Sequence, residues 1–205
     1  MSENKFSSTE AMASYGIGLQ MGQQLVNTFP GVSLSAALAG MEDAFSGNNP
    51  QISHEDINNA FRTIQAQLEA DKAQNAKQMA SQGEAFLAEN AQRPEVTVTS
   101  SGLQYEIIAN GSGEKPKASS TVSTHYRGTL LDGTEFDSSY SRNAPAQFPV
   151  NGVIAGWTEA LQLMNVGAKW KLYIPYQLAY GERGAGGSIG PYQALIFEIE
   201  LLDIV

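Results

Sequence analysis

The 205-residue sequence predicts an α+β fold, in which an all-helical N-terminal module and a long spacer helix precede an antiparallel sheet wrapped around one short helix. Three observations support this prediction. Apolar residues recur at helical spacing through the first 90 residues, β-branched segments dominate from residue 96 onward, and one short helical pattern interrupts them. A single short helix among many strands is best buried when the sheet wraps around it.

The first 52 residues predict a helical dimerisation module. Apolar residues recur at helical spacing over 8–28 and again over 34–45. Two helices in so short a stretch cannot enclose a core of their own, and the chain has no cysteine that could staple them. We therefore predict a homodimer formed through residues 1–68. The alternative is that these helices pack on the C-terminal domain of the same chain.

Residues 53–92 predict one long linker helix. Glycine and proline are absent from 53–82, and apolar residues step by four, three and four from Ile57 to Leu68. After Glu69 this stripe fades into alanine and polar residues. A helix continuous to about residue 90 would be roughly 55 Å long. Because its second half is polar all round, we expect that half to be a solvated spacer arm.

Residues 93–205 predict a compact antiparallel domain. A turn with Asp-Gly chemistry follows Leu131, and no internal repeat is visible. The strands are expected at 96–99, 103–108, 121–129, 147–150, 168–174 and 194–202.

The one short helical pattern in this domain runs from Val153 to Leu163. Trp157, Ala160 and Met164 lie on its apolar face together with Leu161. An indole in the first helical turn would face the open end of the surrounding sheet. Trp157 is therefore predicted to form the floor of a binding pocket.

Composition excludes several classes of function. The net charge is −9, with 4 basic and 10 acidic residues over 1–90 and 8 basic and 11 acidic over 91–205. No basic stripe exists to replace counterions on phosphates, so we expect no nucleic-acid partner. The chain has no cysteine, and its two histidines, His54 and His125, have no metal-ligand spacing around them, so we expect no metal and no cofactor.

The sequence also bears on location. The N-terminus lacks the basic flank, apolar run and small-residue cleavage site of a secretory signal. No apolar run approaches the roughly 18 residues needed to span a bilayer. We therefore expect no membrane contact and a cytoplasmic location.

No nucleophile-base pair stands out among the residues that could carry chemistry, and no phosphate-binding loop is present. Asp137 and Arg142 are five residues apart and can pair, whereas His125 is expected to make a structural hydrogen bond. The loop 181–190 contains five glycines and is either a mobile flap or a cluster of tight turns. Aromatic residues are dense in this half of the chain: Tyr126, Phe136, Phe148, Trp157, Tyr180, Tyr192 and Phe197.

Three motifs of the C-terminal half resemble the FKBP family of peptidyl-prolyl cis-trans isomerases. They are HYRGTLLDGTEFDSS at 125–139, FPVNGVIAGWTEAL at 148–161, and LAYGERG at 178–184, which LIFEIELLDI follows. The resemblance covers over half of the chain in consistent order and spacing. The helical N-terminal half is similar to the Mip-like bacterial branch, whose members dimerise through their first helices and carry the catalytic domain on a long third helix.

The resemblance implies a role for each matching position. Trp157 matches the pocket floor on which the substrate proline rests. Asp137 matches a carboxylate at the wall, with Arg142 as its ion-pair partner. The Ile154 N–H and the Tyr180 hydroxyl match the donors that hold substrate carbonyls. The remaining matches are apolar wall and flap residues: Tyr126, Phe136, Phe148, Val153, Ile154, Ile189 and Phe197.

Four positions depart from the family pattern. Ala146 stands where some members have a phenyl ring, Ala185 and Ser188 replace bulkier groups, and Gly190 stands where proline is frequent. We therefore expect a looser flap with fewer apolar contacts to substrate and inhibitor.

The resemblance implies a peptidyl-prolyl isomerase that accelerates rotation of X-Pro bonds in proline-containing unfolded or partly folded polypeptides. The expected mechanism is non-covalent stabilisation of the twisted amide in an apolar pocket, with a dimer that assists substrate capture. Macrolide inhibitors of the immunosuppressant type are expected partners. The alternative is a peptide-binding chaperone with incidental isomerase activity.

Overall fold

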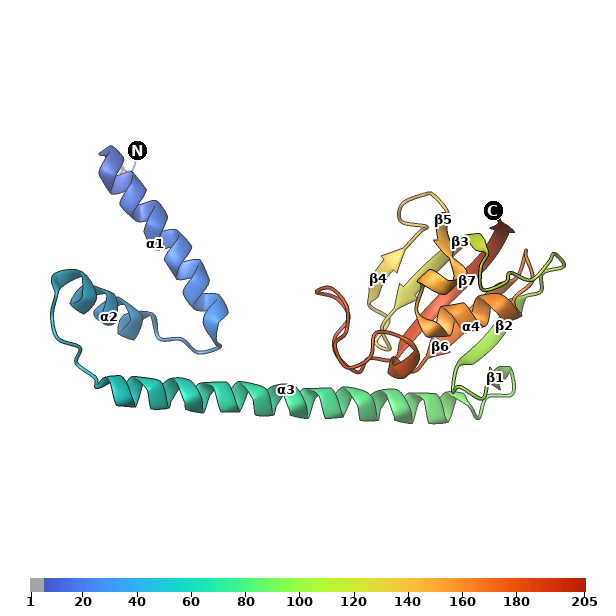
Figure 1. Ribbon diagram of the computed structural model, residues 1–205, viewed down its shortest axis with the longest axis horizontal. Helices are drawn as coiled ribbons and strands as arrows, with labels where there is room; N and C mark the ends of the chain where they lie inside the picture. Colours follow the sequence, from blue (N-terminus) through green and yellow to red (C-terminus); the bar gives the residue numbers. More distant parts are fainter. Residues whose placement is uncertain (1–5) are drawn as a thin grey trace. The chain divides into compact units, whose positions relative to one another are not determined.

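The computed structural model describes residues 6–205, which divide after Ala70 into two compact units (Figure 1). The division falls inside the segment predicted as the linker, 53–92. The division into a dimerisation module, a linker helix and a catalytic domain beginning at residue 93 stays a prediction.

The first unit is helical. Helix α1 spans Thr9–Thr28 and helix α2 spans Leu34–Ser46, in agreement with the predicted periodicity. Ser8 caps α1 by accepting a hydrogen bond from the Ala11 N–H at 3.1 Å. Neither α1 nor α2 contains a buried residue, so their apolar side chains remain accessible.

Helix α3 spans His54–Asn90 without interruption, as predicted. The expectation of a solvated second half is wrong for its last turns. Gly83 and Asn90 are buried, and the ring of Phe86 lies 6.0 Å from that of Tyr173. The residues of α3 that contact the second unit, Gly83, Phe86 and Asn90, recur every three to four positions. Two of them are glycine and asparagine, so they do not form a continuous apolar stripe. For that reason the apolar periodicity did not reveal them.

A seven-stranded antiparallel sheet forms most of the second unit. Its strand order is β1-β2-β6-β7-β3-β4, and β5 pairs with β3 beside that path. The strands are β1 Val96–Val98, β2 Gln104–Ala109, β3 Thr121–Thr129, β4 Glu135–Ser138, β5 Ala146–Pro149, β6 Lys169–Ile174 and β7 Leu195–Ile204. All the predicted strands are present with boundaries shifted by up to two residues. Strand β4 was not predicted, because it is only four residues long and directly follows the Asp-Gly turn.

Strand β7 shows how the sheet separates a dry face from a wet one. Phe197, Ile199 and Leu201 are buried, whereas Glu198 and Glu200, which alternate with them, lie partly exposed. Successive residues of a strand point to opposite faces of the sheet. The alternation therefore directs three large apolar side chains into the core.

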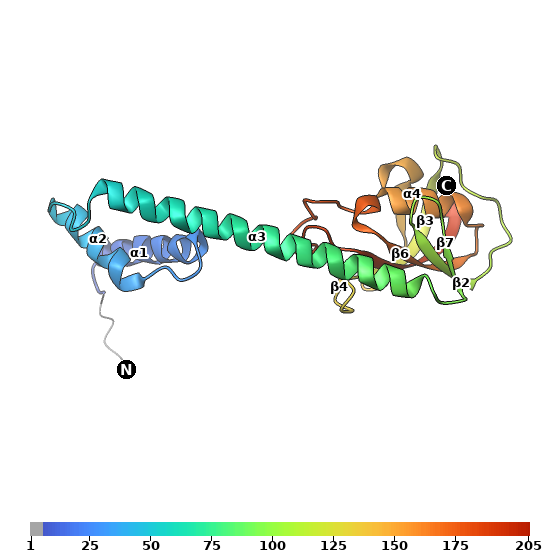
Figure 2. The ribbon, with the colours of Figure 1, turned by 90° about the horizontal axis from the view of Figure 1, so that it is seen from below.

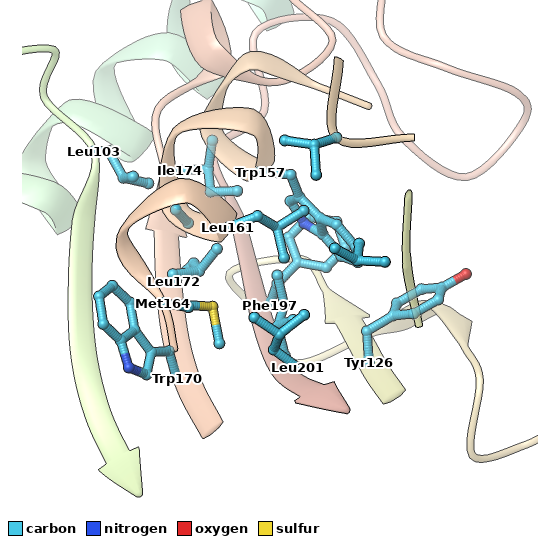
Figure 3. Packing of buried hydrophobic residues seen from close by; sticks show 14 of the residues in the cluster. Leu103, Tyr126, Trp157, Leu161, Met164, Trp170, Leu172, Ile174, Phe197 and Leu201 are labelled. Atoms are coloured by element: carbon cyan, nitrogen blue, oxygen red, sulfur yellow. The ribbon is translucent and has the colours of Figure 1, made fainter. Parts of the chain in front are cut away.

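Helix α4, Ala155–Leu163, packs against the dry face (Figure 3). Its predicted apolar face is confirmed, since Trp157 is 4% exposed and Ala160, Leu161 and Met164 are fully buried. Gly156 permits the close approach, because a Cβ there would lie 2.6 Å from Cγ2 of Ile174 in β6. Two 3-10 helices, Val150–Gly152 (η1) and Tyr176–Leu178 (η2), lie before α4 and after β6 respectively.

Within residues 6–205, no helix is both long enough and apolar enough to cross a bilayer.

Candidate active site

A cavity of about 270 Å³ opens beside the N-terminal turn of α4. Its volume lies just below the range of pockets for drug-sized ligands, so it suits one small ring better than an extended molecule. It brings together nine of the eleven predicted site residues; Arg142 and Ile189 do not line it. The lining is Tyr126, Phe136, Asp137, Phe148, Gly152, Val153, Ile154, Trp157, Tyr180 and Phe197.

Trp157 lies among three other aromatic rings. The ring centroids of Tyr126 and Phe197 are each 5.2 Å from the indole, and that of Phe148 is 5.7 Å away. All three rings are nearly perpendicular to the indole, an arrangement that aromatic quadrupoles favour. The buried Nε1 has no hydrogen-bond partner within the described residues. The indole is thus held by packing and still lines the cavity (Figure 3).

Gly128 makes room for the aromatic wall. Phe136 and Phe197 form a perpendicular pair with centroids 5.5 Å apart. A Cβ at Gly128 in β3 would lie 2.6 Å from Cζ of Phe136 and 2.7 Å from Cε1 of Phe197. Any larger residue would displace both rings. Sequence reasoning missed this residue, although a glycine within a strand often marks a close approach.

Asp137 is locked by two partners. The Tyr126 hydroxyl donates a hydrogen bond to Asp137 Oδ2 at 2.5 Å, and Arg142 Nη1 donates to Oδ1 at 2.5 Å. Arg142 Nη2 also donates to the Tyr126 hydroxyl at 2.7 Å, which closes the network. The predicted Asp137–Arg142 pair is confirmed. Arg142 acts from outside the cavity, because it contacts the wall residues rather than the empty space.

The hydrogen bonds among Tyr126, Asp137 and Arg142 set the protonation states of the cavity wall. Burial alone would raise the pKa of Asp137, but the hydrogen bonds from Tyr126 and Arg142 outweigh it and lower that pKa below its ordinary value. Burial raises the pKa of Tyr126, and the hydrogen bond to Asp137 adds to the effect. At neutral pH the wall therefore presents a carboxylate and a protonated phenol.

Ser139 holds the backbone beside this network. It is fully buried, and its Oγ accepts a hydrogen bond from the Tyr126 N–H at 2.8 Å. The same Oγ lies 2.9 Å from Nδ1 of His125, so the expectation of a structural hydrogen bond for that histidine is confirmed. Strand β3 and the residues after β4 are thus tied together where Tyr126 and Asp137 meet.

Two polar groups at the cavity are candidate donors. Ile154 is the N-cap of α4, and its carbonyl accepts hydrogen bonds from the N–H groups of Trp157 and Thr158, both at 3.0 Å. Its own N–H has no acceptor within residues 6–205. Tyr180 is 39% exposed, and burial, followed by the charge of Asp137, raises the pKa of its hydroxyl. Both groups can donate to a bound carbonyl.

Ile189 lies in the segment 181–190, where the resemblance places it, but it does not line the cavity, and its role in substrate binding stays a prediction. It is 8% exposed and belongs to the core cluster rather than to the cavity lining. An isolated β-bridge joins it to Ala185, so the glycine-rich segment 181–190 contains a paired turn. At Gly184, with φ of +66°, a Cβ would lie 2.2 Å from the Ile189 carbonyl oxygen.

The site combines an apolar cavity, a fixed carboxylate and two donors. In residues 6–205, no three His, Asp or Glu side chains gather as a metal ion would require. The arrangement can bind a small apolar ring and hold the chain attached to it.

Comparisons with known proteins identify the family of both halves. Residues 112–202 match the family described as FKBP-type peptidyl-prolyl cis-trans isomerase. Residues 10–107 match the domain described as amino terminal to FKBP-type peptidyl-prolyl isomerase. The two matches together take in the helices, the sheet and the cavity.

Curated relatives extend the match over nearly the whole chain. The chain is 49% identical over 206 residues to the FKBP-type 22 kDa peptidyl-prolyl cis-trans isomerase of Escherichia coli, covering 100% of both chains. It is 41% identical over 195 residues to the outer membrane protein MIP of Legionella longbeachae, covering 93% of this chain and 84% of that protein. The cytoplasmic location expected from the sequence stays a prediction.

A solved structure agrees with these matches. The crystal structure of FkpA from Escherichia coli superposes with a TM-score of 0.74 at 35% identity, covering 97% of this chain and 98% of that one. The predicted α+β fold, a helical region followed by an antiparallel FKBP domain, is confirmed. The chain belongs to the FKBP-type peptidyl-prolyl cis-trans isomerases.

Proposed function

We propose that the cavity accelerates rotation of X-Pro bonds by binding the proline ring and stabilising the twisted amide without a covalent step. One observation carries the proposal. An apolar cavity with an indole among its walls has two donors, a hydroxyl and a backbone N–H, beside it. The substrates are proline-containing unfolded or partly folded polypeptides.

The physical basis is the polarity of the amide. Uncatalysed rotation takes tens to hundreds of seconds, because twisting breaks amide resonance at a cost of roughly 20 kcal/mol. At the perpendicular geometry the nitrogen becomes pyramidal and the amide loses charge separation. This species is less polar than the planar amide, so transfer from water into an apolar cavity favours it. Only interactions that favour the twisted form raise the rate.

Each named residue has a distinct role in this proposal. Trp157 supports the proline ring, while Tyr180 and the Ile154 N–H hold the carbonyls on its C-terminal side. Asp137 has a mixed role: its charge faces the rotating carbonyl, and its oxygens hold the wall through Tyr126 and Arg142.

The first test is isomerisation of a short Xaa-Pro peptide by the full chain. Trp157→Ala and Asp137→Ala should each lower kcat/KM severalfold or more, because they remove the apolar support and the fixed charge. Asp132→Ala is the matched control, since Asp132 caps the exposed turn before β4 through the Thr134 N–H. Near-ultraviolet circular dichroism checks that each variant keeps its packing. Unchanged rates in both variants would favour the alternative, a peptide-binding chaperone with incidental isomerase activity.

We also propose that residues 1–68 form a homodimer. In α1 and α2, Val26 is 73% exposed, Leu34 is 64% exposed and Phe45 is 96% exposed. No atom lies within 4 Å of a Cβ built at Gly18 or Gly22, which are one turn apart on an open hollow of about 1050 Å³ along α1. Several large apolar side chains exposed on two short helices favour an association surface over a free one. A second copy offers the same apolar surface and the same small residues.

Sedimentation equilibrium tests the dimer directly. The chain has a mass of 22.0 kDa, so the full protein should sediment at twice that mass. Gly22→Leu should weaken the association, because a leucine fills the space available to a second helix. Gly187→Ala, in an exposed loop of the other unit with open space around it, serves as a control and should leave the mass unchanged. A full chain at the monomer mass would contradict the dimer.

The dimer offers two cavities to one unfolded chain. Binding at the first cavity makes binding at the second intramolecular, which raises overall affinity without new contacts.

Macrolide inhibitors of the family should compete with substrate for the cavity, with affinity reduced by Ala185, Ser188 and Gly190. A competitive inhibition assay on the full chain measures this.

A further inference from the structure

The loop that follows Tyr180 is closed where Gly181 and Tyr192 meet, and these two residues are called the loop neck. The Tyr192 N–H donates a hydrogen bond to the Gly181 carbonyl at 3.0 Å, and the Tyr192 ring packs at 5.1 Å against that of Tyr176. Tyr192 has φ of +58°, a left-handed conformation that is uncommon for a bulky residue. Such a conformation persists only when its surroundings hold it. Tyr180 stands directly before this neck, so the neck helps to set its position.

Gln193 supplies one of the interactions that hold the neck. Its Oε1 accepts a hydrogen bond from the Gly190 N–H at 2.7 Å, across Pro191 and the left-handed Tyr192. The contact is partly buried, where a hydrogen bond is less exposed to competition from water. One side chain thus spans the strained residue and fixes the return of the loop toward β7.

Gln193 also faces helix α3. Its Nε2 lies 3.9 Å from Sδ of Met79, a weak contact, and a Cβ at Gly83 would lie 3.2 Å from Cβ of Ala194. Figure 1 and Figure 2 show the segment that leads into β7 beside α3. Helix α3 therefore lies against Ala194 and contacts the side chain of the preceding residue, Gln193.

The same helix is fixed to the sheet at its end. Asn90 Nδ2 donates to Gln104 Oε1 at 2.9 Å, and Gln104 Nε2 donates to the Leu87 carbonyl at 2.8 Å. Gln104 lies in β2 and is buried. The last turns of α3 are thus held at two places, at β2 and at the segment before β7.

We propose that Gln193 is a positioning residue for isomerisation, which ties the loop neck to helix α3 and so holds Tyr180 at the cavity. The link to turnover rests on the proposed role of Tyr180 as a donor to substrate. Loss of the Gly190 hydrogen bond allows the neck to relax toward ordinary backbone conformations. The fraction of molecules with Tyr180 in place then falls, and apparent substrate affinity falls with it.

The experiment compares three variants of the full chain. Gln193→Ala should raise amide hydrogen exchange of residues 182–190 about tenfold and lower kcat/KM roughly 3- to 10-fold, mainly through KM. Gln193→Glu keeps the acceptor for the Gly190 N–H and loses only the weak contact with Met79, so both values should stay within about twofold of the wild type. Gln82→Ala removes an exposed glutamine of α3 that lines a small surface cavity together with Met79 and Gln193, and it should change neither value.

A fourth variant tests the helix. Gly83→Leu should raise loop exchange as Gln193→Ala does, because the larger side chain pushes α3 away from Ala194. Leucine is a better helix former than glycine, so α3 itself is kept. Unchanged loop exchange in Gly83→Leu would overturn the role given to α3.

A double variant separates this proposal from the one on which it rests. If Gln193 acts through Tyr180, Gln193→Ala should cause no further loss of kcat/KM in a Tyr180→Phe background. Full activity of Tyr180→Phe alone would overturn the role of Tyr180 and the link to turnover. Unchanged loop exchange in Gln193→Ala would overturn the tether itself, whatever Tyr180 does.

Discussion

Two leucines show how differently the helical module and the isomerase domain place apolar side chains. Leu38 in α2 is 54% exposed, whereas Leu161 in α4 is fully buried. Both lie on apolar faces that the sequence predicts with the same helical periodicity. The difference arises from what surrounds each helix, since α4 lies under a seven-stranded sheet and α2 belongs to a unit made of helices alone.

The comparison shows that periodicity identifies a face but does not say what covers it. A twisted sheet around one helix closes a core within a single chain. The two short helices of the first unit do not close such a core, since neither α1 nor α2 contains a buried residue. The exposed apolar side chains of the module are the ones that a second copy would cover in the proposed homodimer.

The largest expected effect comes from truncating the two leucines. Leu161→Ala should lower the free energy of unfolding of the isomerase domain by about 2–5 kcal/mol, because it leaves a cavity in a closed core. Leu38→Ala should leave that domain unchanged and weaken the dimer instead. Urea denaturation at two protein concentrations distinguishes the two variants. Only a loss of dimer stability makes the unfolding midpoint depend on protein concentration. Equal losses in the free energy of unfolding for Leu161→Ala and Leu38→Ala would contradict the difference between the isomerase domain and the helical module.

Deletion of residues 1–50 should separate the capture of unfolded chains by the dimer from isomerisation in the cavity. We expect a monomer whose kcat/KM on a short Xaa-Pro peptide stays within about twofold of the full chain, because the cavity lies wholly in the second unit. Refolding of a whole protein limited by proline isomerisation should be slower with this variant, since avidity is lost. A truncated chain as effective as the full chain on protein substrates would rule out dimer-assisted capture.

The smallest expected effect concerns pH. The folded-state pKa of Asp137 is lowered, so the stability contributed by its ion pair is complete above about pH 4 and is lost as pH falls through the folded pKa. Urea unfolding of the wild type and of Asp137→Asn should therefore differ by a constant amount from pH 5 to 7. The difference should shrink below pH 4. A difference that grew toward low pH would contradict the sign of this shift.

At the alkaline side, burial and the charge of Asp137 raise the pKa of the Tyr180 hydroxyl above its ordinary value, so it stays protonated at neutral and mildly alkaline pH. No loss of kcat/KM from this residue is expected between pH 6 and 9.

Much of the site could be predicted from the sequence, because its residues come from contiguous motifs. The motifs and the family resemblance predict Trp157, Asp137 and Phe197 at one cavity, and all three line it. Gly128 and Gly152 were missed, since a glycine contributes no side chain to a motif. Ile189 packs in the core cluster and does not line the cavity, and residues 181–190 have no periodicity that shows which side chain turns inward.

The sequence by itself determined the local order of helices and strands, the apolar face of α4 and the acidic, cysteine-free composition. These depend on backbone propensity and on the alternation of side chains along one segment. Only the tertiary structure decided the docking of the last turns of α3, the closed network of Tyr126, Asp137 and Arg142, and the tie between Gln193 and Gly190. Each of these depends on distances set by the packing of the whole domain, which no local pattern encodes.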